Sequence, residues 1–363
     1  MSRSITDARL AFHATHDDVA SATTKEFLVL FFHGDRTIEL IDAKSTKTFL
    51  KRSPAPQLSQ AQFFIGANVV VFGRVLHITS YADKVTEQLC ERLSESTVVV
   101  LGEANFPRVG EALDVLTQEC RFGVSDMQVL RVGKFDKDGP YADAIARLPP
   151  QWASGREAAL LIHVIRDHAV AKSQELPGRI GDKKSVWVAA DRGEADAVAG
   201  LFALARGRPT AVIDGTPSST VVVKPDTLGA QRGGSVLQTI IDQAAAQGNP
   251  LTLVALSQMS LSSLAADQFL NAYKGILPDY RATVENLASG AVWAAQFVGG
   301  EDPVGVVRGI CGPYDPVIAK RLRPKSLRGK MGTDGVRNVV HCSDLPEDGC
   351  VDAEYLWSTR RHT

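Results

Sequence analysis

The chain has 363 residues, enough for two or three ordinary domains with a sizeable core. Hydrophobic residues make up 44% of it and charged residues 22%, which is typical of a globular protein and excludes a disordered chain. The formal net charge of -1 provides no overall basic field, so we expect neither DNA nor an anionic membrane as a partner.

Cysteine usage and apolar segments indicate the compartment. The five cysteines are odd in number, widely spaced and without a CxxC pair, which argues against a disulfide framework and a zinc site. Residues 1–18 have no long apolar run and therefore do not resemble a secretory signal. No run reaches the roughly 18 apolar residues that a membrane span needs. We therefore expect a soluble intracellular protein in a reducing compartment.

The first part of the chain changes character near residue 26. Residues 1–25 are polar and show no clear pattern, so we expect an N-terminal arm that is ordered only when docked. EFLVLFFHGDRTIELID then predicts two strands around a turn at His33-Gly34-Asp35. FFIGANVVVFGRVLHITSY continues the strand pattern, so a small β-rich module is predicted over residues 26–92.

An internal repeat follows this module. STVVV occurs at Ser96–Val100 and again at Ser219–Val223, and each copy precedes a short loop and an amphipathic helical pattern. Each copy later carries ASG before a further apolar strand. The plan predicts two α/β or α+β domains of one kind, at residues 96–212 and 217–360.

The second repeat concentrates residues suited to phosphate. Lys224 directly follows a strand in VVVKPDTL, where a point cation can emerge at a sheet edge. Arg308 in VVRGICG and Arg328 in SLRGKMG add two guanidinium groups that match phosphate oxygens bidentately. In NVVHCSD, strand alternation puts Val340 and His341 on opposite faces.

His341 can act as a nucleophile if a carboxylate accepts a proton from one imidazole nitrogen, and Asp352 or Glu354 is the candidate. Taken singly, these residues have ordinary structural explanations. A lysine after a strand is usually a solvated end, and a lone histidine is more often structural. The KPD, RGICG, SLRG and NVVHCSD segments become informative together and in this order.

In this order the segments resemble the nucleoside diphosphate kinase family, in which a strand with KPD, an arginine before a loop glycine, a TIRG-like arginine and N-x-x-H-G-S-D recur. FLVLFFHGDRTIELIDAKSTKTFLKR and FFIGANVVVFGR are similar to a DM-ten module. A DM-ten module before two kinase-like domains resembles a ciliary and flagellar branch of this family, over about residues 24–357. The implied fold is α+β multidomain: a small β-rich DM-ten module, then two ferredoxin-like kinase domains with antiparallel sheets.

The resemblance implies a role for each matching residue of the second domain. His341 takes the place of the phosphorylated histidine, and Asp352 that of an orienting glutamate, with Glu354 as the alternative. Tyr280 matches the aromatic residue that stacks on the base, and Val284 its aliphatic neighbour. Ser343 matches the serine beside the histidine. The remaining nucleotide-binding positions are Lys224, Arg308, Tyr314, Arg328 and Asn338. No protein side chain is assigned to a metal, and Mg²⁺ is expected to arrive with a nucleoside triphosphate or diphosphate.

The chain departs from the family pattern at several of these positions. Cys342 replaces the motif glycine, Tyr314 replaces a loop threonine, and Asp352 is one methylene shorter than glutamate. A tyrosine that the family carries near the position of Leu270 is missing. Each change is expected to slow phosphoryl transfer, because positioning and electrostatics supply nearly all of its catalysis.

The first domain has lost the features of a kinase site. Gly102-Glu103-Ala104 stands in place of Lys-Pro-Asp, and Asp191 aligns with the histidine, where a carboxylate would repel phosphates. We expect a catalytically dead copy that is kept for packing or as a partner surface. A live site with a shifted alignment is the alternative.

Two compatible functions follow from the resemblance. The first is a microtubule inner protein of doublet microtubules, located in the cytoplasm, the cytoskeleton and the axoneme of cilia and flagella. Its partners would be tubulin, other axonemal microtubule-associated proteins and the γ-tubulin ring complex. The alternative is an active ping-pong kinase that transfers the γ-phosphate of a nucleoside triphosphate to a diphosphate through phosphohistidine at His341. No motif in the sequence recognises tubulin, so the structural role rests on the resemblance alone.

Overall fold

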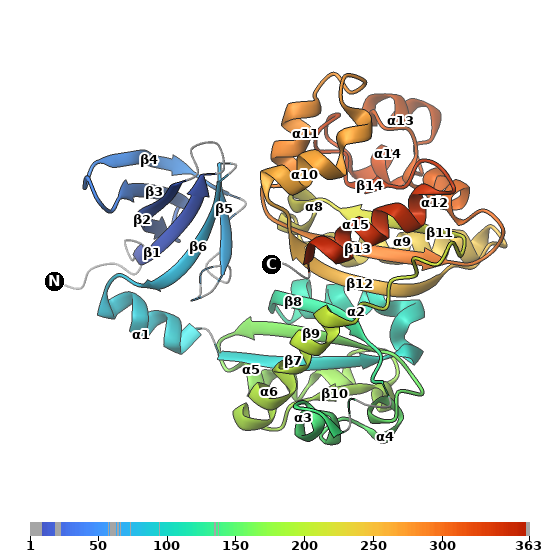
Figure 1. Ribbon diagram of the computed structural model, residues 1–363, viewed down its shortest axis with the longest axis horizontal. Coiled ribbons are helices and arrows are strands. Elements are labelled where there is room, and N and C mark those ends of the chain that lie inside the picture. The colour runs from blue at the N-terminus through green and yellow to red at the C-terminus, as the bar shows by residue number, and fades with distance from the viewer. Residues whose placement is uncertain are drawn as a thin grey trace.

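The computed structural model describes residues 9–18, 23–56, 58, 63, 65, 67–72, 74–93, 95–133, 136 and 138–360. Figure 1 shows an N-terminal β-rich part on one side and two mixed helix-and-strand units stacked beside it. Within the described residues the strands form two separate sheets, one of six strands and one of eight. No helix in this part of the chain is long and apolar enough to cross a membrane.

The N-terminal module is an antiparallel sheet followed by one helix. Its elements are β1 (Arg9–Asp18), β2 (Thr23–Phe32), β3 (Thr37–Asp42), β4 (Thr48–Pro54), β5 (Asn68–Val71), β6 (Arg74–Tyr81) and α1 (Lys84–Leu93). The strands lie in the order β4-β3-β2-β1-β6-β5. Aromatic rings fill the core, where Phe63 stacks on Phe12 at 5.5 Å and on Phe31 at 4.6 Å between ring centroids.

Strand β1 corrects the prediction of an N-terminal arm. It pairs with β2 along its whole length and with β6 on its other side, so it is an inner strand of the sheet. Leu10 and Phe12 are fully buried, as alternate residues of a half-buried strand should be. The predicted arm over residues 1–25 is therefore wrong for β1 and for the start of β2. Residues 1–8 and 19–22 lie outside the described part.

Unit 1 is the first of the two mixed units and begins at the first STVVV segment. Val98 and Val100 are as fully buried as Val99, so this strand is covered on both faces and has a continuous apolar run. The elements of unit 1 are β7 (Glu95–Gly102), η3 (Glu103–Arg108), α2 (Val109–Asp114), η4 (Val115–Glu119), β8 (Gly123–Leu130), α3 (Ala142–Ala146), α4 (Pro150–Ala153), β9 (Ala159–Arg166), α5 (Ala169–Ser173), η6 (Leu176–Gly178), η7 (Lys183–Ser185), β10 (Val186–Val188), α6 (Arg192–Ala199) and α7 (Leu201–Gly207).

Unit 2 repeats the same plan with longer helices. Its elements are β11 (Ser218–Val223), α8 (Pro225–Gly229), α9 (Gly233–Ala246), β12 (Thr252–Ser260), α10 (Ser263–Phe269), η8 (Asn271–Tyr273), α11 (Tyr280–Leu287), β13 (Ala291–Val298), α12 (Pro303–Cys311), α13 (Pro316–Leu322), α14 (Leu327–Met331), β14 (Val340–Cys342) and α15 (Asp348–Arg360). The segment between the units, residues 208–217, packs against β13 of unit 2. The side-chain amide of the buried Gln296 accepts from the Val212 N–H at 2.7 Å and donates to the Val212 carbonyl at 2.8 Å.

Both units contribute to one long sheet, in the order β10-β7-β9-β8-β12-β13-β11-β14. Within each unit the fourth strand lies beside the first, followed by the third and the second, and the neighbouring strands are antiparallel. The repeated STVVV segments therefore form equivalent strands, β7 and β11. At the junction, β8 and β12 pair through Gln128 and Ser257. One hydrophobic cluster extends across both units beneath this sheet.

The units also pack helix against helix beside the junction. Where α2 crosses α9, Gly110 and Gly234 are so close that a Cβ added to either would lie 2.3 Å from the other's carbonyl oxygen. Asp114 of α2 accepts a hydrogen bond from Ser235 Oγ of α9 at 2.6 Å. Glycine is needed at this crossing because any side chain would push the two backbones apart.

Candidate functional site

His341 lies at the middle of β14, opposite Val222 of β11. Its half-buried ring meets Phe269 and Tyr273 edge-on, with ring centroids 5.0 and 5.6 Å away. No hydrogen bond from another described residue reaches either ring nitrogen. Burial, followed by the nearby Lys224 cation, lowers the pKa of His341 to about 3. The imidazole is therefore neutral at pH 7 and carries the lone pair that a nucleophile requires.

Strained backbone positions this strand. Val339 has φ of 77°, a rare conformation for a β-branched residue. The N–H of Val340 donates to the Asn338 carbonyl at 3.0 Å, which closes a γ-turn with positive φ at its centre. The turned Val339 carbonyl accepts from the N–H of Lys224 at 3.0 Å. The strained turn at Val339 thus lets the start of β14 form a hydrogen bond with Lys224, the residue that follows β11.

Lys224 is buried and shares its charge with protein oxygens. Its Nζ donates to Asn338 Oδ1 at 2.6 Å and to the Val336 carbonyl at 2.8 Å. Asn338 in turn donates through Nδ2 to the Tyr314 carbonyl at 3.0 Å. Burial, and then the neighbouring Arg328 cation, lower the pKa of Lys224 to about 7. The lysine is therefore a cation that can be neutralised near physiological pH.

The two arginines are also bonded to protein acceptors. Arg328 is buried and donates from Nη1 to the Gly312 carbonyl at 2.7 Å and from Nη2 to the Val340 carbonyl at 3.0 Å. Its Nε is buried and has no hydrogen-bond partner among the described residues. Arg308 is exposed and donates from Nη1 to the Asp344 carbonyl at 2.6 Å. A phosphate would have to compete with these acceptors.

Tyr273 is a site residue that sequence comparison missed. Its hydroxyl donates to Asp344 Oδ2 at 2.6 Å, and its ring faces His341. The short 3₁₀ turn of η8 brings this residue to the position, whereas a tyrosine was expected near Leu270. A tyrosine is therefore present three residues after Leu270, where the sequence was expected to lack one. Burial, followed by the hydrogen bond to Asp344, raises the pKa of Tyr273, so its hydroxyl stays protonated.

The structure does not place Asp352 against the histidine. Its Oδ2 accepts from Ser343 Oγ at 2.8 Å, and no contact to His341 is formed in the described part. Burial is the main cause that raises the pKa of Asp352 to about 7. Glu354, the alternative, is exposed and is not part of the site. The orienting role predicted for Asp352 would therefore need a movement of the side chain.

The proposed base-binding residues lie on α11. The Tyr280 hydroxyl donates to Asp267 Oδ1 at 2.9 Å, which fixes the ring at the start of the helix. Val284 is only 8% exposed and packs in the core, so it does not offer a free face for a base. The Tyr314 hydroxyl lies 3.5 Å from Thr283 Oγ1 and thereby links the loop before α13 to α11.

Cys342, next to His341, was expected to slow phosphoryl transfer, but its side chain points away from the histidine. It is buried in the core on the opposite face of β14 and forms a hydrogen bond with Cys311 at the end of α12. The Cys311 contact is the main cause that lowers the pKa of Cys342 to about 7. The replacement of the family glycine therefore alters the packing beneath the strand rather than the approach to His341.

In unit 1 the corresponding place is filled. Val100 of β7 and Val222 of β11 both face the outer helices of their units, although STVVV alone would match Val222 to Val99. Sheet register pairs Val100 with Trp187 and Val222 with His341, so Trp187 stands at the histidine position. Gly102 occupies the position of Lys224, and a Cβ there would lie 2.6 Å from the buried Trp152 ring.

The predicted alignment of Asp191 with the histidine is therefore wrong. Asp191 instead caps α6, where its side chain accepts from the Glu194 N–H at 2.8 Å. Glu194 in turn accepts from the N–H of Ala190, the residue before the cap, at 2.6 Å.

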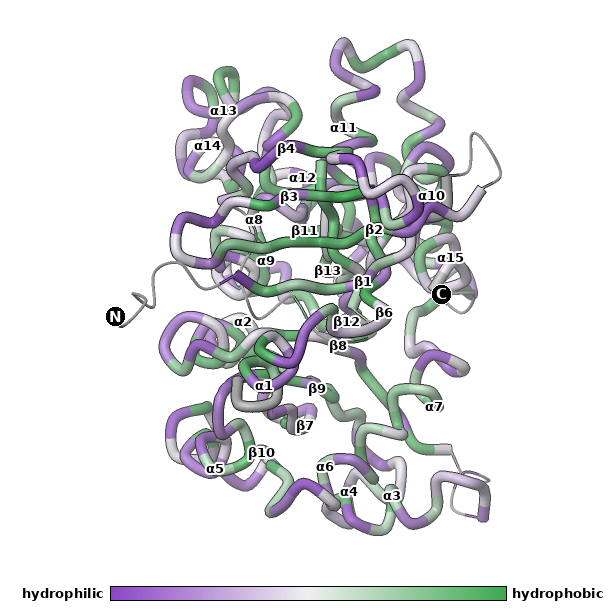
Figure 2. The backbone as a smooth tube through the Cα atoms, turned by 90° about the vertical axis from the view of Figure 1, so that its left-hand side faces the viewer, coloured by the Kyte–Doolittle hydropathy of each residue, from purple (hydrophilic) through white to green (hydrophobic). Residues whose placement is uncertain are grey.

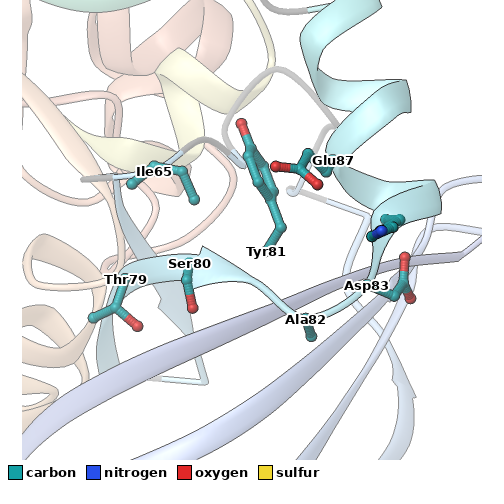
Figure 3. Close-up of a pocket in the computed structure, with 8 residues that line it drawn as sticks. Ile65, Thr79, Ser80, Tyr81, Ala82, Asp83 and Glu87 are labelled. Carbon is teal, nitrogen blue, oxygen red and sulfur yellow. The ribbon is translucent and has the colours of Figure 1, made fainter.

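A separate hollow of about 400 Å³ lies on the N-terminal module between β6 and α1. Figure 3 shows Tyr81 and Glu87 on its wall, with Ile65 at its rim. None of the predicted site residues lines it. Within the described residues, no group of three or more His, Cys, Asp or Glu side chains is arranged to hold a metal ion.

Comparison with known proteins agrees with this geometry. Residues 218–361 match the family Nucleoside diphosphate kinase. The nucleoside diphosphate kinase of Aquifex aeolicus is 30% identical over 138 residues, which cover 38% of this chain and 92% of that protein. The chain therefore belongs to the nucleoside diphosphate kinase family. This confirms the predicted kinase-like domain, with its antiparallel sheet and mixed helices, in unit 2.

A longer similarity relates the whole chain to one kind of family member. Nucleoside diphosphate kinase homolog 7 from Rattus norvegicus is 26% identical, and that from Mus musculus 27% identical, over 376 residues. Each comparison covers 96% of this chain and 93% of the relative, which confirms the predicted resemblance. A crystal structure of the Aquifex aeolicus nucleoside diphosphate kinase covers 39% of this chain and 94% of its own, with 29% identity and a TM-score of 0.34.

Proposed function

We propose that this chain is a microtubule inner protein of ciliary and flagellar doublet microtubules that retains a nucleoside diphosphate kinase-type nucleotide site in unit 2. One observation carries the nucleotide site: a neutral His341 lies beside the linked Lys224 and Asn338 in unit 2, whereas Trp152 fills the corresponding space in unit 1. Unit 1 and the N-terminal module would then serve binding rather than catalysis.

The residues of unit 2 support phosphoryl transfer through the histidine. A neutral ring nitrogen of His341 attacks the γ-phosphorus, a nitrogen–phosphorus bond forms, and the bond to the bridging oxygen breaks, so a nucleoside diphosphate leaves. In the second half, a terminal phosphate oxygen of another diphosphate attacks the same phosphorus and releases the histidine. Mg²⁺ arrives as part of the nucleotide substrate and neutralises phosphate charge.

The cations near His341 determine how readily a nucleotide enters. Lys224, Arg308 and Arg328 already donate to protein oxygens in the free protein. A nucleotide phosphate must replace those acceptors before the cations stabilise transferred charge. This competition favours slow turnover and supports a mainly structural role with a retained site.

The structural role rests on three supporting observations. The similarity to nucleoside diphosphate kinase homolog 7 extends over 96% of the chain, well beyond the kinase unit. The N-terminal module forms a sheet of its own, consistent with the resemblance to a DM-ten module. Unit 1 keeps the strand order of unit 2 without its site. Tubulin, other axonemal proteins and the γ-tubulin ring complex are the partners we propose, with the cytoskeleton and axoneme as the location.

Fractionation of cilia tests the structural role. A doublet component remains with axonemes after detergent and high-salt washes, because lattice proteins are held by many contacts at once. We expect the chain in that pellet, with a soluble cytosolic enzyme as the control in the detergent fraction. Complete release with detergent alone would reject the axonemal location.

Phosphate labelling tests the second candidate function, turnover as a ping-pong kinase. It is favoured by the neutral, unbonded imidazole of His341. Purified protein is incubated with Mg²⁺ and ATP labelled in the γ-phosphate, and acid-labile, alkali-stable label is measured, with His341→Ala as the control. Label that GDP removes from wild type demonstrates transfer. Nucleotide binding without label would leave a binding site and reject the kinase.

A further inference from the structure

Helix α13 presents large apolar side chains to solvent. Val317, Ile318 and Leu322 are 57%, 47% and 72% exposed, whereas Ala319 is fully buried against unit 2. Ile318 and Leu322 are four residues apart and therefore share one face of the helix. Figures 1 and 2 place α13 at the periphery of the molecule, with hydrophobic and hydrophilic residues side by side. Exposed apolar groups gathered on one face are typical of a binding surface.

The same stretch is strongly basic. Its exposed cations are Lys320, Arg321, Arg323 and Lys325. Residues 316–331 contain no Asp or Glu, although the chain as a whole has a net charge of -1. No carboxylate of the described part lies within ion-pair distance of Lys320, Arg321 or Lys325. These positive charges are therefore not neutralised inside the protein and are complementary to an anionic partner.

We propose that the exposed face of α13 docks an acidic protein surface that carries apolar side chains. The acidic chemistry of this partner follows from α13 itself, and tubulin is the protein to probe because the structural role proposed above requires it. Lys320 and Arg321 meet carboxylates, and Ile318 and Leu322 pack against apolar groups between them. The charges speed encounter and fix the orientation, while burial of the apolar face slows release.

The apolar face distinguishes a protein partner from the other anionic macromolecules. DNA presents phosphates along its backbone and would leave Ile318 and Leu322 without a partner. A membrane surface is bound by amphipathic helices that lie in the interface. Helix α13 has only seven residues and is fastened to unit 2 through the buried Ala319 and Pro316. An acidic protein surface satisfies both the charges and the apolar side chains.

The location of α13 connects this surface to the nucleotide site. The helix begins directly after the loop of Tyr314 and ends shortly before Arg328. Arg323, just past its end, donates to the Gly309 carbonyl of α12 at 3.3 Å. A partner that holds α13 therefore also holds the two loops that carry site residues.

Binding of the full chain to two probes tests the proposal. The probes are the αβ-tubulin dimer, which exposes every face of the subunit, and an acidic glutamate–tyrosine copolymer. Lys320→Glu/Arg321→Glu removes the charge match, and Ile318→Ser/Leu322→Ser removes the apolar contact. Lys183→Glu/Lys184→Glu reverses two exposed cations of unit 1 and is the matched control. Thermal unfolding of each variant confirms that the protein remains folded.

We expect each α13 variant to weaken binding to both probes by about tenfold or more, and the control to change it by less than about twofold. Wild-type binding to tubulin that the α13 variants leave unchanged would overturn the docking surface while leaving the structural role intact. Binding to the copolymer through α13, with none to tubulin, would support the acidic surface and reject tubulin. Binding to neither probe would reject both.

Further binding measurements test whether the α13 face binds a different partner. Duplex DNA and vesicles of anionic phospholipid are measured with the same variants, and mass photometry reports the oligomeric state of the chain. A greater loss of binding to DNA or vesicles than to tubulin would overturn the assignment to a protein. Dissociation of a self-associated wild-type chain by the α13 variants would assign the face to a second copy instead.

Discussion

At the scale of single residues, the site contains buried groups whose pKa values are shifted to about 7, so their charge changes near physiological pH. Lys224 is 2% exposed, and its ammonium is held by Asn338 Oδ1 and a backbone carbonyl. Its pKa is lowered to about 7, mainly by burial. A phosphate that replaces these neutral oxygens would stabilise the charged form, so binding of a nucleotide and of a proton are linked.

Nucleotide affinity should therefore fall as the pH rises through 7. Below pH 7 the free protein already carries the Lys224 proton, whereas above it binding must also take up a proton. We expect the dissociation constant for ADP to be about tenfold higher at pH 8 than at pH 6. Isothermal titration measures it, and Lys224→Gln reports any change due to titration of the nucleotide itself. Equal pH dependence in wild type and variant would contradict the role of Lys224.

Asp352 should reduce stability at high pH. Its folded-state pKa is raised from 3.8 to about 7, so its stabilising contribution is complete below pH 3.8 and is lost as the pH rises through 7. Asp352→Asn should therefore be more stable than wild type at pH 8 by about 1–2 kcal/mol, after allowance for solvent near this half-buried group, and equal at pH 4. Urea unfolding measures this.

The control for Asp352→Asn is Glu354→Gln, an exposed position on the same helix. It should leave the free energy of unfolding unchanged at both pH values. A stabilisation of Asp352→Asn that is the same at pH 4 and pH 8 would show that the carboxyl group does not titrate as its burial implies.

Sequence motifs predicted the residues that lie at fixed offsets from strands. Lys224 directly follows β11 and His341 lies within β14, so strand pairing alone brings them together. Two contacts depended on details that spacing does not show. Tyr273 reaches the histidine through a short 3₁₀ turn. The shorter side chain of Asp352 bonds to Ser343 rather than to His341.

At the scale of elements, the structure depends on close contacts between helices of different units. The crossing of α2 over α9 brings Gly110 and Gly234 into backbone contact. This crossing lies beside the β8–β12 junction. It holds the start of α9, which follows α8, and Lys224 is the residue just before α8. Packing in unit 1 therefore supports the geometry of unit 2.

Gly234→Ala should weaken the contact between α2 and α9. Its Cβ would lie 2.3 Å from both the Gly110 carbonyl and Asp114 Oδ1, so the helices must separate. We expect a loss of about 1–3 kcal/mol in the free energy of unfolding, as for other overpacked cores. Gly207→Ala is the control, because nothing lies within 4 Å of its Cβ. An equal effect of both substitutions on urea unfolding would contradict the close crossing.

The repeat predicted the paired elements correctly where loops have similar lengths. STVVV marks β7 and β11, which occupy equivalent places in the long sheet. The alignment failed beyond them, because unit 1 has a shorter path to its last strand, and only sheet register identifies Trp187. β1 was missed although Leu10, Phe12 and Ala14 alternate along it, because the stretch around it is mostly polar.

At the scale of the whole molecule, unit 1 supplies unit 2 with an internal partner. The edge of β12 and one side of α9 are covered within the same chain. The two halves of the long sheet have the same strand order, so one unit stands where a second subunit could stand.

Unit 2 produced alone should therefore self-associate. A fragment of residues 208–363 exposes the unpaired edge of β12 and the glycine face of α9, which another copy can cover. Mass photometry and analytical ultracentrifugation should show concentration-dependent dimers of the fragment that the full chain does not gain. A folded fragment that stays monomeric would show that the β12 edge and the glycine face of α9 contribute little to association.

The junction of the long sheet also sets how the molecule responds to mechanical load. Most neighbouring strands share several paired residues, but β8 and β12 meet through the single pair Gln128 and Ser257. Force applied across the strands would concentrate at this pair and at the glycine crossing beside it. Such a load would therefore part the two units at this junction before it separated the strands within either unit.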